Sequence, residues 1–506
     1  MREVRVRFAP SPTGALHIGG VRTALYNYLL ARKHKGTMIL RIEDTDQGRY
    51  VPGAEEFIIE SLSWAGIKID EGVSVGGPHA PYRQSERKPI YKQYAQKLIT
   101  DGKAYYAFDT EDELEIMRKA TPNAQYDGTT RLQMKNSLTL STNEVEQKLS
   151  AGEKHVIRLK VPANEEVRLN DLIRGEVIVN SSQVDDKVLM KSDGMPTYHL
   201  ANVVDDYLMK ISHVIRGEEW LPSAPLHVLL YRYLGWEKDM PEFAHLPLLL
   251  KPDGNGKLSK RDADKMGFPI FPINWTDPKT NEFAQGFREK GYLPDALINF
   301  LAFLGWNPGT EQEIFSMEQL IDTFTLDRIG KAGAKFDIQK ANWFNEQYLR
   351  NKPEDQLIQF LFDALKKENI QCDTVKARKI IAVMKDRVTF PNDFWLQGKF
   401  FFIAPTTFDE QVVVKKWNDD AVKVLSAYHD EIRQVDQLTS EGAKELLEKV
   451  TASLNIKTGQ ILQVLRTSLT GTSSGPDLMM TMEILGRDEV VKRISYALET
   501  VKVKIS

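Results

Sequence analysis

Hydrophobic and polar positions in the first sixty residues follow the order strand, loop, helix, strand. Apolar and charged residues alternate over residues 4–8, which predicts a short strand. Apolar positions recur at helical spacing over residues 21–29, and Gly36 after three basic residues predicts the end of this helix. A second strand is predicted over residues 37–42. Such a unit forms a right-handed parallel crossover, so the loop at residues 10–20 and the acidic residues after the second strand should face one cleft.

The alternation of predicted strands and helices is interrupted later in the chain and then resumes. Residues 105–191 hold short β-like runs between polar segments, which predicts a mixed insertion into the sheet domain. A strand is predicted over residues 211–215, and a helix capped by Ser223 is predicted over residues 225–234. Beyond about Gly330 the pattern is mostly helical. We therefore predict an α/β fold with a Rossmann-like parallel sheet, a mixed insertion and a mostly helical C-terminal region.

Apolar stripes predict two of the C-terminal helices. The first stripe consists of Leu357, Phe360, Leu361, Ala364 and Leu365, and the second of Leu446, Leu447, Val450 and Leu454. Between them lies a basic run made up of Lys376, Arg378, Lys379, Lys385 and Arg387. A run of this kind is by itself typical of a solvated face.

Length and composition narrow the class of protein. At roughly 150 residues per domain, 506 residues predict three or four units. The hydrophobic share of 42% and the charged share of 27% exclude a disordered or collagen-like chain. The single cysteine, Cys372, excludes an internal disulfide and a zinc site built from several thiolates. Since we find neither a signal-peptide pattern nor the roughly 20 apolar residues of a membrane helix, we expect a soluble protein of a reducing compartment. The net charge of −3 leaves no overall attraction to nucleic acid.

Three segments have the chemistry of a ligand site. The segment RFAPSPTG at residues 7–14 precedes His17 and two glycines at the start of the predicted helix, where free N–H groups attract phosphate. A histidine there can donate to a phosphate oxygen, although by itself it is more often a surface or cap histidine. The basic segment KLSKR at residues 257–261 suits a polyphosphate, although most basic loops are merely solvated. The carboxylates of RIEDTD at residues 41–46 suit either an amine ligand or a helix cap.

Two other motifs lack a residue or element that the site they resemble requires. Gly256 and Lys257 look like the end of a P-loop, but Leu258 stands where that loop needs Ser or Thr to bind magnesium. Residues 471–475 have the glycine spacing of a hydrolase nucleophile elbow, which requires a preceding strand. A predicted helix precedes them instead, so we predict a loop.

The segments HIGG at residues 17–20 and KLSKR at residues 257–261 resemble the paired HIGH and KMSKS motifs of class I aminoacyl-tRNA synthetases. Further segments narrow the resemblance to bacterial-type glutamyl-tRNA synthetases; they are RFAPSPTG, RIEDTD, YRQSER at residues 82–87, MPTYHLANVVDD at residues 195–206 and VIRGEEW at residues 214–220. The resemblance spans residues 1 to about 350, and the helical remainder is similar to the anticodon-binding region of that family.

The resemblance implies ATP-dependent ligation of L-glutamate to tRNA(Glu) through a glutamyl-adenylate, with activation waiting for bound tRNA. The catalytic residues that it implies are His17, Lys257, Ser259 and Lys260. The ATP contacts that it implies are His17, Gly19, Glu219 and Lys260. Magnesium would accompany ATP and be held mainly by phosphates and water, so no protein metal ligand is expected.

The implied amino-acid pocket fits the charges of glutamate. Glutamate carries two carboxylates and one ammonium, which call for two guanidiniums and one carboxylate from the protein. The glutamate-binding residues that the resemblance implies are Arg7, Ala9, Ser11, Glu43, Tyr198, Asn202 and Arg216. We expect Glu43 to take the ammonium, while the pairing of each arginine with a carboxylate stays open.

Two features depart from the pattern of the family. Gly20 replaces the second histidine of the general class I motif, a replacement that glutamate enzymes commonly tolerate. Some relatives carry a zinc knob with a Cys-x-Cys segment near residues 106–108, where this chain has no cysteine. We therefore predict that zinc is absent.

Carried over to this chain, the resemblance predicts five segments. They are the first half of the catalytic domain at 1–104, an insertion that binds the acceptor end at 105–191, the second half at 192–250, the KLSKR loop with a stem-contact domain at 251–330, and a helical anticodon-binding domain at 331–506. The basic run would then line the anticodon stem. We expect a cytoplasmic monomer without a membrane partner, and leave open whether tRNA(Gln) is also charged.

Two rival functions remain. A glutaminyl-tRNA synthetase shares the motifs, but that family ends in β-barrels and an uncharged amide would leave one pocket arginine unpaired. A non-catalytic tRNA-binding relative would keep the fold, but it would have no reason to keep His17, Lys257 and Lys260.

Overall fold

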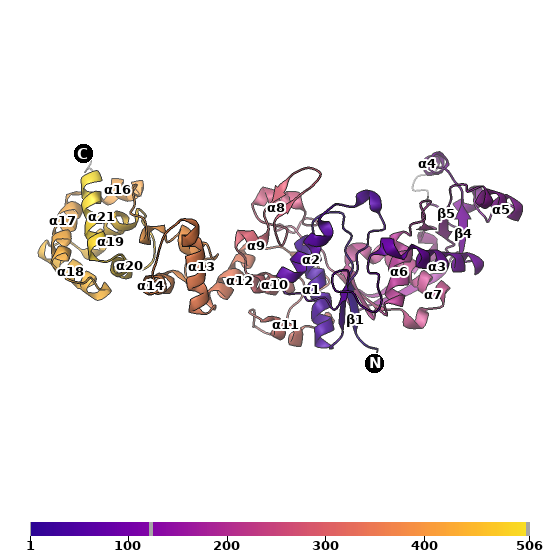
Figure 1. Cartoon of the computed structure of the whole chain (residues 1–506), viewed down its shortest axis with the longest axis horizontal. Coiled ribbons are helices and arrows are strands. Elements are labelled where there is room, and N and C mark those ends of the chain that lie inside the picture. The colour runs from indigo at the N-terminus through magenta and orange to yellow at the C-terminus, as the bar shows by residue number, and fades with distance from the viewer. Residues whose placement is uncertain (1, 121–124, 502–506) are drawn as a thin grey trace. The chain divides into compact units, whose positions relative to one another are not determined.

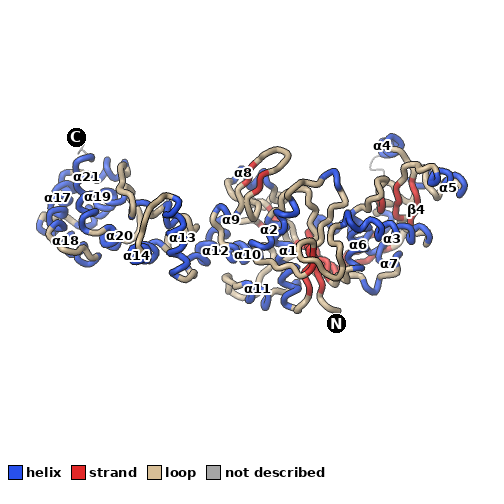
Figure 2. The backbone as a smooth tube through the Cα atoms, viewed as in Figure 1, coloured by secondary structure: helices blue, strands red, loops and turns tan. Residues whose placement is uncertain are grey.

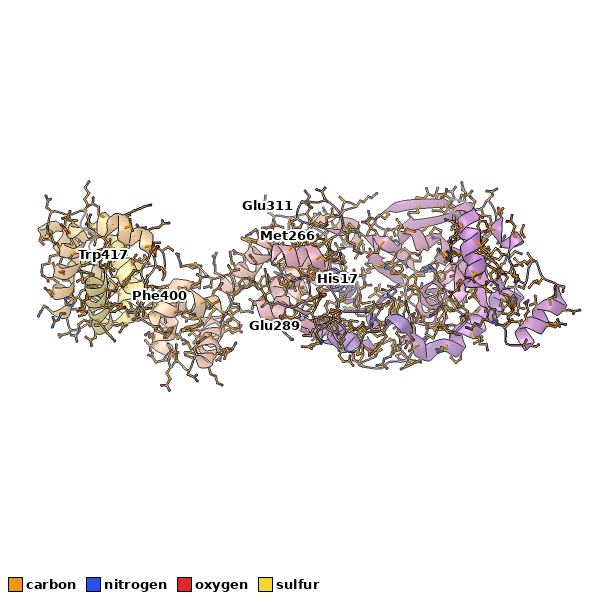
Figure 3. All side chains as sticks on the ribbon, turned by 90° about the horizontal axis from the view of Figure 1, so that it is seen from above. His17, Met266, Glu289, Glu311, Phe400 and Trp417 are labelled. Atoms are coloured by element: carbon orange, nitrogen blue, oxygen red, sulfur yellow. The ribbon has the colours of Figure 1, made fainter. Side chains whose placement is uncertain are left out.

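The computed structural model describes residues 2–120 and 125–501, in two compact units. Unit 1 is Met1–Ala341 and unit 2 is Asn342–Ser506. Figure 1 traces the chain through both, and Figure 3 marks His17 in unit 1 and Phe400 and Trp417 in unit 2. Within the described residues, we find no helix with the length and apolar character needed to cross a membrane.

The centre of unit 1 is a sheet of seven strands among the described residues, and its neighbouring strands are parallel except for the β6–β7 hairpin. In spatial order, the strands are β3 (Glu71–Gly72), β2 (Thr37–Leu40), β1 (Arg5–Phe8), β9 (His213–Gly217), β10 (Glu242–Leu246), β6 (Glu166–Asp171) and β7 (Gly175–Asn180). The predicted parallel crossover from residues 4–8 to residues 37–42 is confirmed, because β1 and β2 pair in parallel with Phe8 opposite Leu40.

Helix α1 (Ile18–Lys33) joins these two strands, and its predicted apolar positions are buried. The helix end differs in detail from the prediction. The residue with positive φ is Lys35, at +54°, and not Gly36. Gly36 is required for another reason, since a Cβ there would lie 2.0 Å from the carbonyl oxygen of Val4, the residue just before β1.

Two predicted boundaries move. The strand predicted over residues 211–215 is β9, which begins at His213, because Ile211 still closes the turn after α6 (Tyr198–Leu208) through its N–H bond to the Asp206 carbonyl. Ser223 stands at the N-cap of α7 (Ala224–Leu234), but its side chain makes no capping bond. A 3-10 helix, η5 (Glu218–Ser223), runs directly into α7 and replaces the expected cap.

The predicted insertion contributes to two sheets. Its strand β5 (Val156–Leu159) pairs with β4 (Ala104–Ala107) on one side and with β8 (Val188–Met190) on the other, in an antiparallel sheet. The β6–β7 hairpin instead joins the central sheet, where Asp171 stands opposite Phe243 of β10. Shorter pairs are β11 (Leu249–Leu250) with β14 (Ala334–Lys335), and β12 (Trp275–Thr276) with β13 (Phe283–Ala284). The predicted five-part division itself stays a prediction.

The remaining helices of unit 1 lie between these strands in the chain. They are α2 (Ala54–Trp64), α3 (Lys88–Thr100), α4 (Glu111–Ala120), α5 (Thr142–Ser150), α6 (Tyr198–Leu208), α8 (Lys260–Met266), α9 (Phe287–Lys290), α10 (Pro294–Ala302) and α11 (Met317–Thr323). The short 3-10 helices are η1 (Gln47–Arg49), η2 (Gln84–Arg87), η3 (Thr130–Gln133), η4 (Ser181–Gln183), η6 (Glu237–Asp239) and η7 (Leu326–Arg328).

The predicted helical C-terminal region is confirmed, and the described part of unit 2 contains only helices and loops (Figure 2). Helix α12 (Ile338–Arg350) crosses the unit boundary. The helices that follow are α13 (Glu354–Lys367), α14 (Thr374–Met384), α15 (Asp393–Leu396), η8 (Lys399–Phe401), α16 (Glu410–Lys416), α17 (Asp419–Arg433), α18 (Ser440–Ser453), α19 (Thr458–Thr470), α20 (Leu478–Leu485) and α21 (Arg487–Thr500).

Both predicted C-terminal stripes lie on helices, α13 and α18, but one position is wrong. Leu454 is 38% exposed, because α18 ends at Ser453 and Asn455 turns the chain with a φ of +55°. The segment at residues 471–475 is a loop after α19, as predicted.

Candidate functional site

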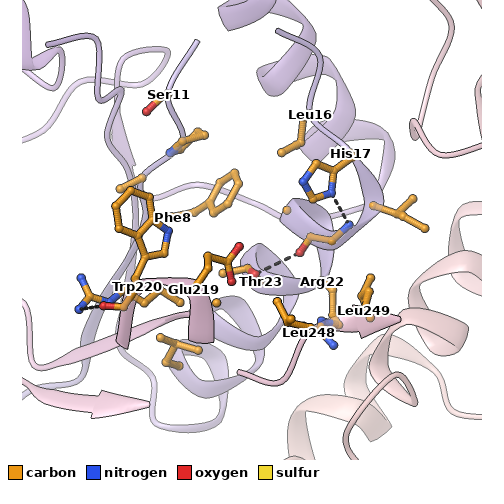
Figure 4. A pocket seen from close by; sticks show the side chains of 18 of the residues that line it. Phe8, Ser11, Leu16, His17, Arg22, Thr23, Glu219, Trp220, Leu248 and Leu249 are labelled. Atoms are coloured by element: carbon orange, nitrogen blue, oxygen red, sulfur yellow. Dashed lines mark hydrogen bonds between the residues drawn. The ribbon is translucent and has the colours of Figure 1, made fainter. Parts of the chain in front are cut away.

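A cavity of about 270 Å³ opens beyond the carboxyl ends of β1 and β9, beside the N-terminus of α1 (Figure 4). The predicted cleft is confirmed, since parts of the loop at residues 10–20 and Glu43 both line this cavity. Most of the predicted site residues come together there; they are Arg7, Ala9, Ser11, His17, Gly19, Glu43, Tyr198, Asn202, Arg216, Glu219 and Lys257.

His17 is the N-cap of α1, so the ordinary structural interpretation of this residue holds. Its Nδ1 accepts the backbone N–H of Gly19 at 3.0 Å. That bond fixes the neutral ring with its proton on Nε2, the nitrogen left to face a ligand. The pKa of His17 lies below its usual value because of desolvation first and the charge of Lys257 second. His17 therefore combines a cap with a donor at a helix N-terminus.

A buried network of charges forms the floor of the site. Arg7 donates to Asp206 from its Nε at 3.0 Å, and Arg41 donates to the same carboxylate at 2.8 Å. Arg41 also donates to Glu43 at 2.9 Å, and Asn202 donates to Glu43 at 3.1 Å. Burial raises the pKa of Glu43, although the two arginines oppose this effect. Glu43 is thus held in place by Arg41, with a carboxylate on the cavity wall.

Arg216 sits among neutral groups. It donates to the Tyr198 hydroxyl at 2.7 Å and to Nε2 of His245 at 3.0 Å. The ring of Tyr198 packs on Trp220 with ring centres 4.3 Å apart. Among the residues that the structure describes, no carboxylate lies within ion-pair distance of Arg216. This buried guanidinium is therefore available to an anion.

The KLSKR segment reaches the cavity only in part. Lys257 lines it and forms a 2.9 Å ion pair with Glu219. Ser259 is the N-cap of α8 and forms a capping box with Asp262, which occupies its hydroxyl. Lys260 pairs with Glu282 at 2.9 Å and, like Ser259, is not among the described lining residues. The catalytic roles of Ser259 and Lys260 stay predictions.

Several residues of this site carried no role in the sequence interpretation. Asp206 and Arg41 lie inside the segments MPTYHLANVVDD and RIEDTD, and an acidic residue within a mostly apolar helix is a signal that could have found Asp206. Asp171 and His245 gave no such signal, because only the pairing of the β6–β7 hairpin with β10 brings them to the site. In the described chain, no group of three or more His, Cys, Asp or Glu side chains is arranged to hold a metal ion.

Comparison with known proteins decides the family. The family described as "tRNA synthetases class I (E and Q), catalytic domain" matches residues 3–343, and "Anticodon binding domain" matches residues 354–498. The glutamate--tRNA ligase of Cytophaga hutchinsonii is 60% identical and is aligned over 100% of this chain and 99% of its own length. The chain belongs to the glutamate–tRNA ligase family of class I aminoacyl-tRNA synthetases. The resemblance inferred from the motifs is confirmed.

Further members of this ligase family agree in sequence and in fold. The glutamate--tRNA ligase of Amoebophilus asiaticus is 59% identical, and the alignment covers 99% of each chain. A crystal structure of a glutamate tRNA ligase from Elizabethkingia meningosepticum, in complex with its amino acid, is 49% identical with a TM-score of 0.95. That match covers 99% of this chain and all of the other, so the predicted fold class is confirmed.

Proposed function

We propose that this chain ligates L-glutamate to tRNA(Glu) with ATP, through a glutamyl-adenylate. The observation that carries the proposal is the cavity itself, where one arginine without a carboxylate partner and one carboxylate lie beside a helix N-terminus. Membership of the class I synthetases implies the use of ATP, generally with Mg²⁺. The glutamate--tRNA ligases that are 54–60% identical to this chain support the same reaction.

At the amino-acid end of the cavity, Arg216 and Glu43 supply opposite charges. Glu43 would accept the substrate ammonium, and Arg216 would donate to a substrate carboxylate. Arg7, with Tyr198 and Asn202, would complete the contacts, while Ala9 and Ser11 would border the amino acid. Glutamine lacks the second carboxylate, and it would leave a buried guanidinium without an anion, which is costly in a desolvated site.

At the nucleotide end, the donors suit a triphosphate. His17 offers Nε2–H, the first turn of α1 offers free N–H groups near Gly19, and Lys257 offers an ammonium. Glu219 would contact the nucleoside part of ATP, and Ser259 and Lys260 would act once their partners Asp262 and Glu282 release them. These groups position charge, which supplies most of the catalysis in such reactions.

The finer predictions about partners remain part of this proposal. We expect a cytoplasmic monomer that has no zinc and no membrane partner. In unit 2, Arg378 pairs with Glu354 and Lys379 pairs with Glu483 at 2.7 Å, so both would have to exchange these partners for phosphates. Lys376 lies over the ring of Phe402, and Lys385 and Arg387 complete the basic run.

The proposal is tested by charging purified tRNA(Glu) and tRNA(Gln) side by side with glutamate, ATP and Mg²⁺. Charging of tRNA(Glu) alone supports a discriminating ligase, and charging of both supports a non-discriminating one. Failure to charge either tRNA, even at high enzyme concentration, would contradict the proposal in favour of a non-catalytic tRNA-binding relative.

Two variants separate the proposed phosphate contact of His17 from its role as the N-cap of α1. His17→Asn keeps a good N-cap acceptor but loses the ring N–H, whereas His17→Ala loses both. If His17 contacts phosphate, kcat should fall by about a hundredfold in both variants, while only His17→Ala should lower the melting temperature. Normal charging by His17→Asn would reduce His17 to a structural cap.

A further inference from the structure

The two pocket arginines differ in their counter-charges. Arg7 and its neighbour Arg41 share the carboxylate of Asp206, so the charge of Arg7 is compensated by the protein itself. Arg216 is 5% exposed, and its described partners are neutral: the Tyr198 hydroxyl, the rings of His245 and His227, and the carbonyl of Trp220. A buried guanidinium needs partners for its five N–H groups, and here neutral acceptors supply them without consuming the charge.

The register of two parallel strands places His245 against Arg216. Arg216 of β9 and His245 of β10 are direct partners across the sheet, so their side chains leave the same face. The Arg216 Nε lies 3.0 Å from the His245 Nε2. For this contact to be a hydrogen bond, Nε2 must carry a lone pair, and the ring proton must therefore sit on Nδ1.

Asp171 selects that tautomer. Its Oδ2 lies 2.6 Å from Nδ1 of His245, in a fully buried position, and accepts a hydrogen bond from the ring Nδ1–H. Its Oδ1 accepts the backbone N–H groups of Ile173 at 3.0 Å and Arg174 at 2.8 Å, so the turn of the β6–β7 hairpin fixes the carboxylate. Burial lowers the pKa of His245, although the bond to Asp171 opposes this effect, and the ring stays neutral near pH 7.

This arrangement keeps the negative charge of Asp171 one imidazole ring away from Arg216. A carboxylate in direct contact with Arg216 would compete with an anionic substrate for the same N–H groups. The ring of His245 instead accepts the Nε–H of the guanidinium and adds no negative charge next to it. The positive charge of Arg216 therefore stays available to an anion in the cavity, which Arg216 lines.

We propose that Asp171 and His245 are positioning residues that aim Arg216 at a carboxylate of the substrate, through the chain Asp171, His245 Nδ1–H, His245 Nε2 and Arg216 Nε–H. The inference rests on the proposed function, because it assigns the substrate anion to Arg216. Neither residue is among the described lining residues of the cavity. Their effect should therefore appear in the KM for glutamate and leave the KM for ATP unchanged.

A matched pair of substitutions at one position tests the chain of hydrogen bonds. In His245→Gln the amide lies at the level of Nε2, so its oxygen can still accept from Arg216. In His245→Asn the amide lies at the level of Nδ1, so it can contact Asp171 but cannot reach Arg216. We expect His245→Asn to raise the KM for glutamate about tenfold to a hundredfold, the usual value of a hydrogen bond to a charged group. His245→Gln should keep the KM close to that of the wild type.

A third variant reverses the tautomer without changing size. In Asp171→Asn the new amide can donate to Nδ1, which moves the ring proton to Nε2, where it faces the donor of Arg216. The KM for glutamate should rise as in His245→Asn, with the KM for ATP unchanged. Because this substitution is isosteric, it tests the chain of hydrogen bonds even if His245→Asn does not fold. Melting curves would show whether each variant folds.

His213→Asn and His213→Gln serve as controls on the same strand, β9, since the described contact of this ring is with Ser212. Neither control should change the KM for glutamate. Equal effects of His245→Asn and His245→Gln, or an unchanged KM in Asp171→Asn, would overturn the proposal. Failure of the proposed function is a separate outcome, because the wild-type enzyme would then charge no tRNA with glutamate.

Discussion

The two units of this chain bury different kinds of side chain. Unit 1 encloses many charged groups, including Arg7, Arg41, Asp206 and Arg216 around the cavity. In the described part of unit 2, one charged side chain is buried, Arg493, which donates to two backbone carbonyls. Aliphatic and aromatic side chains form the core around α16–α21, and apolar side chains of α13 and α14 are buried as well.

Unit 1 must hold charged groups in fixed positions around the cavity, whereas the core of unit 2 depends mainly on apolar packing. Removing charges from water costs free energy that apolar packing does not cost, so buried ions mark positions selected for something other than stability. The same contrast explains why a functional site is easy to place in unit 1. Any RNA contact in unit 2 would use exposed side chains, whose burial and pKa give no such mark.

The largest expected effect comes from breaking the charge network of unit 1. Asp206→Asn removes the carboxylate shared by Arg7 and Arg41 and leaves the buried Arg7 without its described carboxylate partner, while Arg41 keeps Glu43. Loss of one partner of a buried pair costs about 3–5 kcal/mol, so the free energy of unfolding measured in urea should fall by about that amount. Asp101→Asn, which removes an exposed partner of Lys97, is the control and should change little. A wild-type unfolding curve for Asp206→Asn would show that the buried charges do not hold unit 1 together.

A cavity in unit 2 should cost nearly as much but leave amino-acid binding intact. Leu465 of α19 is fully buried, and Leu465→Ala should lower the free energy of unfolding by about 3 kcal/mol. The KM for glutamate, measured below the melting temperature, should not change. Leu462→Ala on the same helix, where the side chain is 38% exposed, should cost much less. A raised KM for glutamate in Leu465→Ala would mean that the two units do not divide their tasks in this way.

The sequence predicted the elements whose causes are local. Alternation at residues 4–8, helical spacing before Gly36 and the motifs at both ends of the cleft all depend on neighbours in the chain, and they appear where expected. The position of Leu454 and the start of β9 were wrong by one or two residues, because single turn residues decide such boundaries. Asp171 and His245 were missed because a strand pairing between segments about 70 residues apart creates their contact.

The histidines predict an acid response that is confined to unit 1. Burial lowers the pKa of six of them, to about 4 for His199; the others are His17, His79, His213, His227 and His245. The unfolded chain protonates its histidines near pH 6.5, whereas these stay neutral in the folded chain until lower pH. Between pH 7 and about pH 4 the unfolded state thus binds more protons, and stability falls as the pH falls. Burial raises the pKa of Glu43 and Asp186, and these two carboxyl groups oppose the trend set by the histidines.

Hydrogen exchange in the full-length chain checks this response, after correction for the pH dependence of the intrinsic rate. The opening free energy of amides in unit 1 should decrease from pH 7 to pH 5. Amides of unit 2, whose histidine is His429, should respond less. His199→Asn should flatten the decrease in unit 1. An equal loss in both units would assign the acid response to groups other than these histidines.

The smallest effect should come from an ion pair at the mouth of the cavity. Lys257 and Glu219 lie 2.9 Å apart, but their side chains are 50% and 43% exposed. Desolvation alone would raise the pKa of Glu219, yet the hydrogen bond from Lys257 keeps this pKa below its ordinary value. Exposed pairs contribute under about 1 kcal/mol, so Glu219→Gln should barely change the free energy of unfolding in urea.

The informative result is the loss of unfolding free energy in Glu219→Gln relative to the loss in Asp206→Asn. Both substitutions turn a carboxylate that lines or supports the same cavity into an amide, so they differ mainly in burial. If the loss of stability in Glu219→Gln approached that in Asp206→Asn, proximity to the site rather than burial would set the cost. A small loss for Glu219→Gln that shrinks further at high salt would place the stability of the site in its buried charges and show that Glu219 holds Lys257 only loosely.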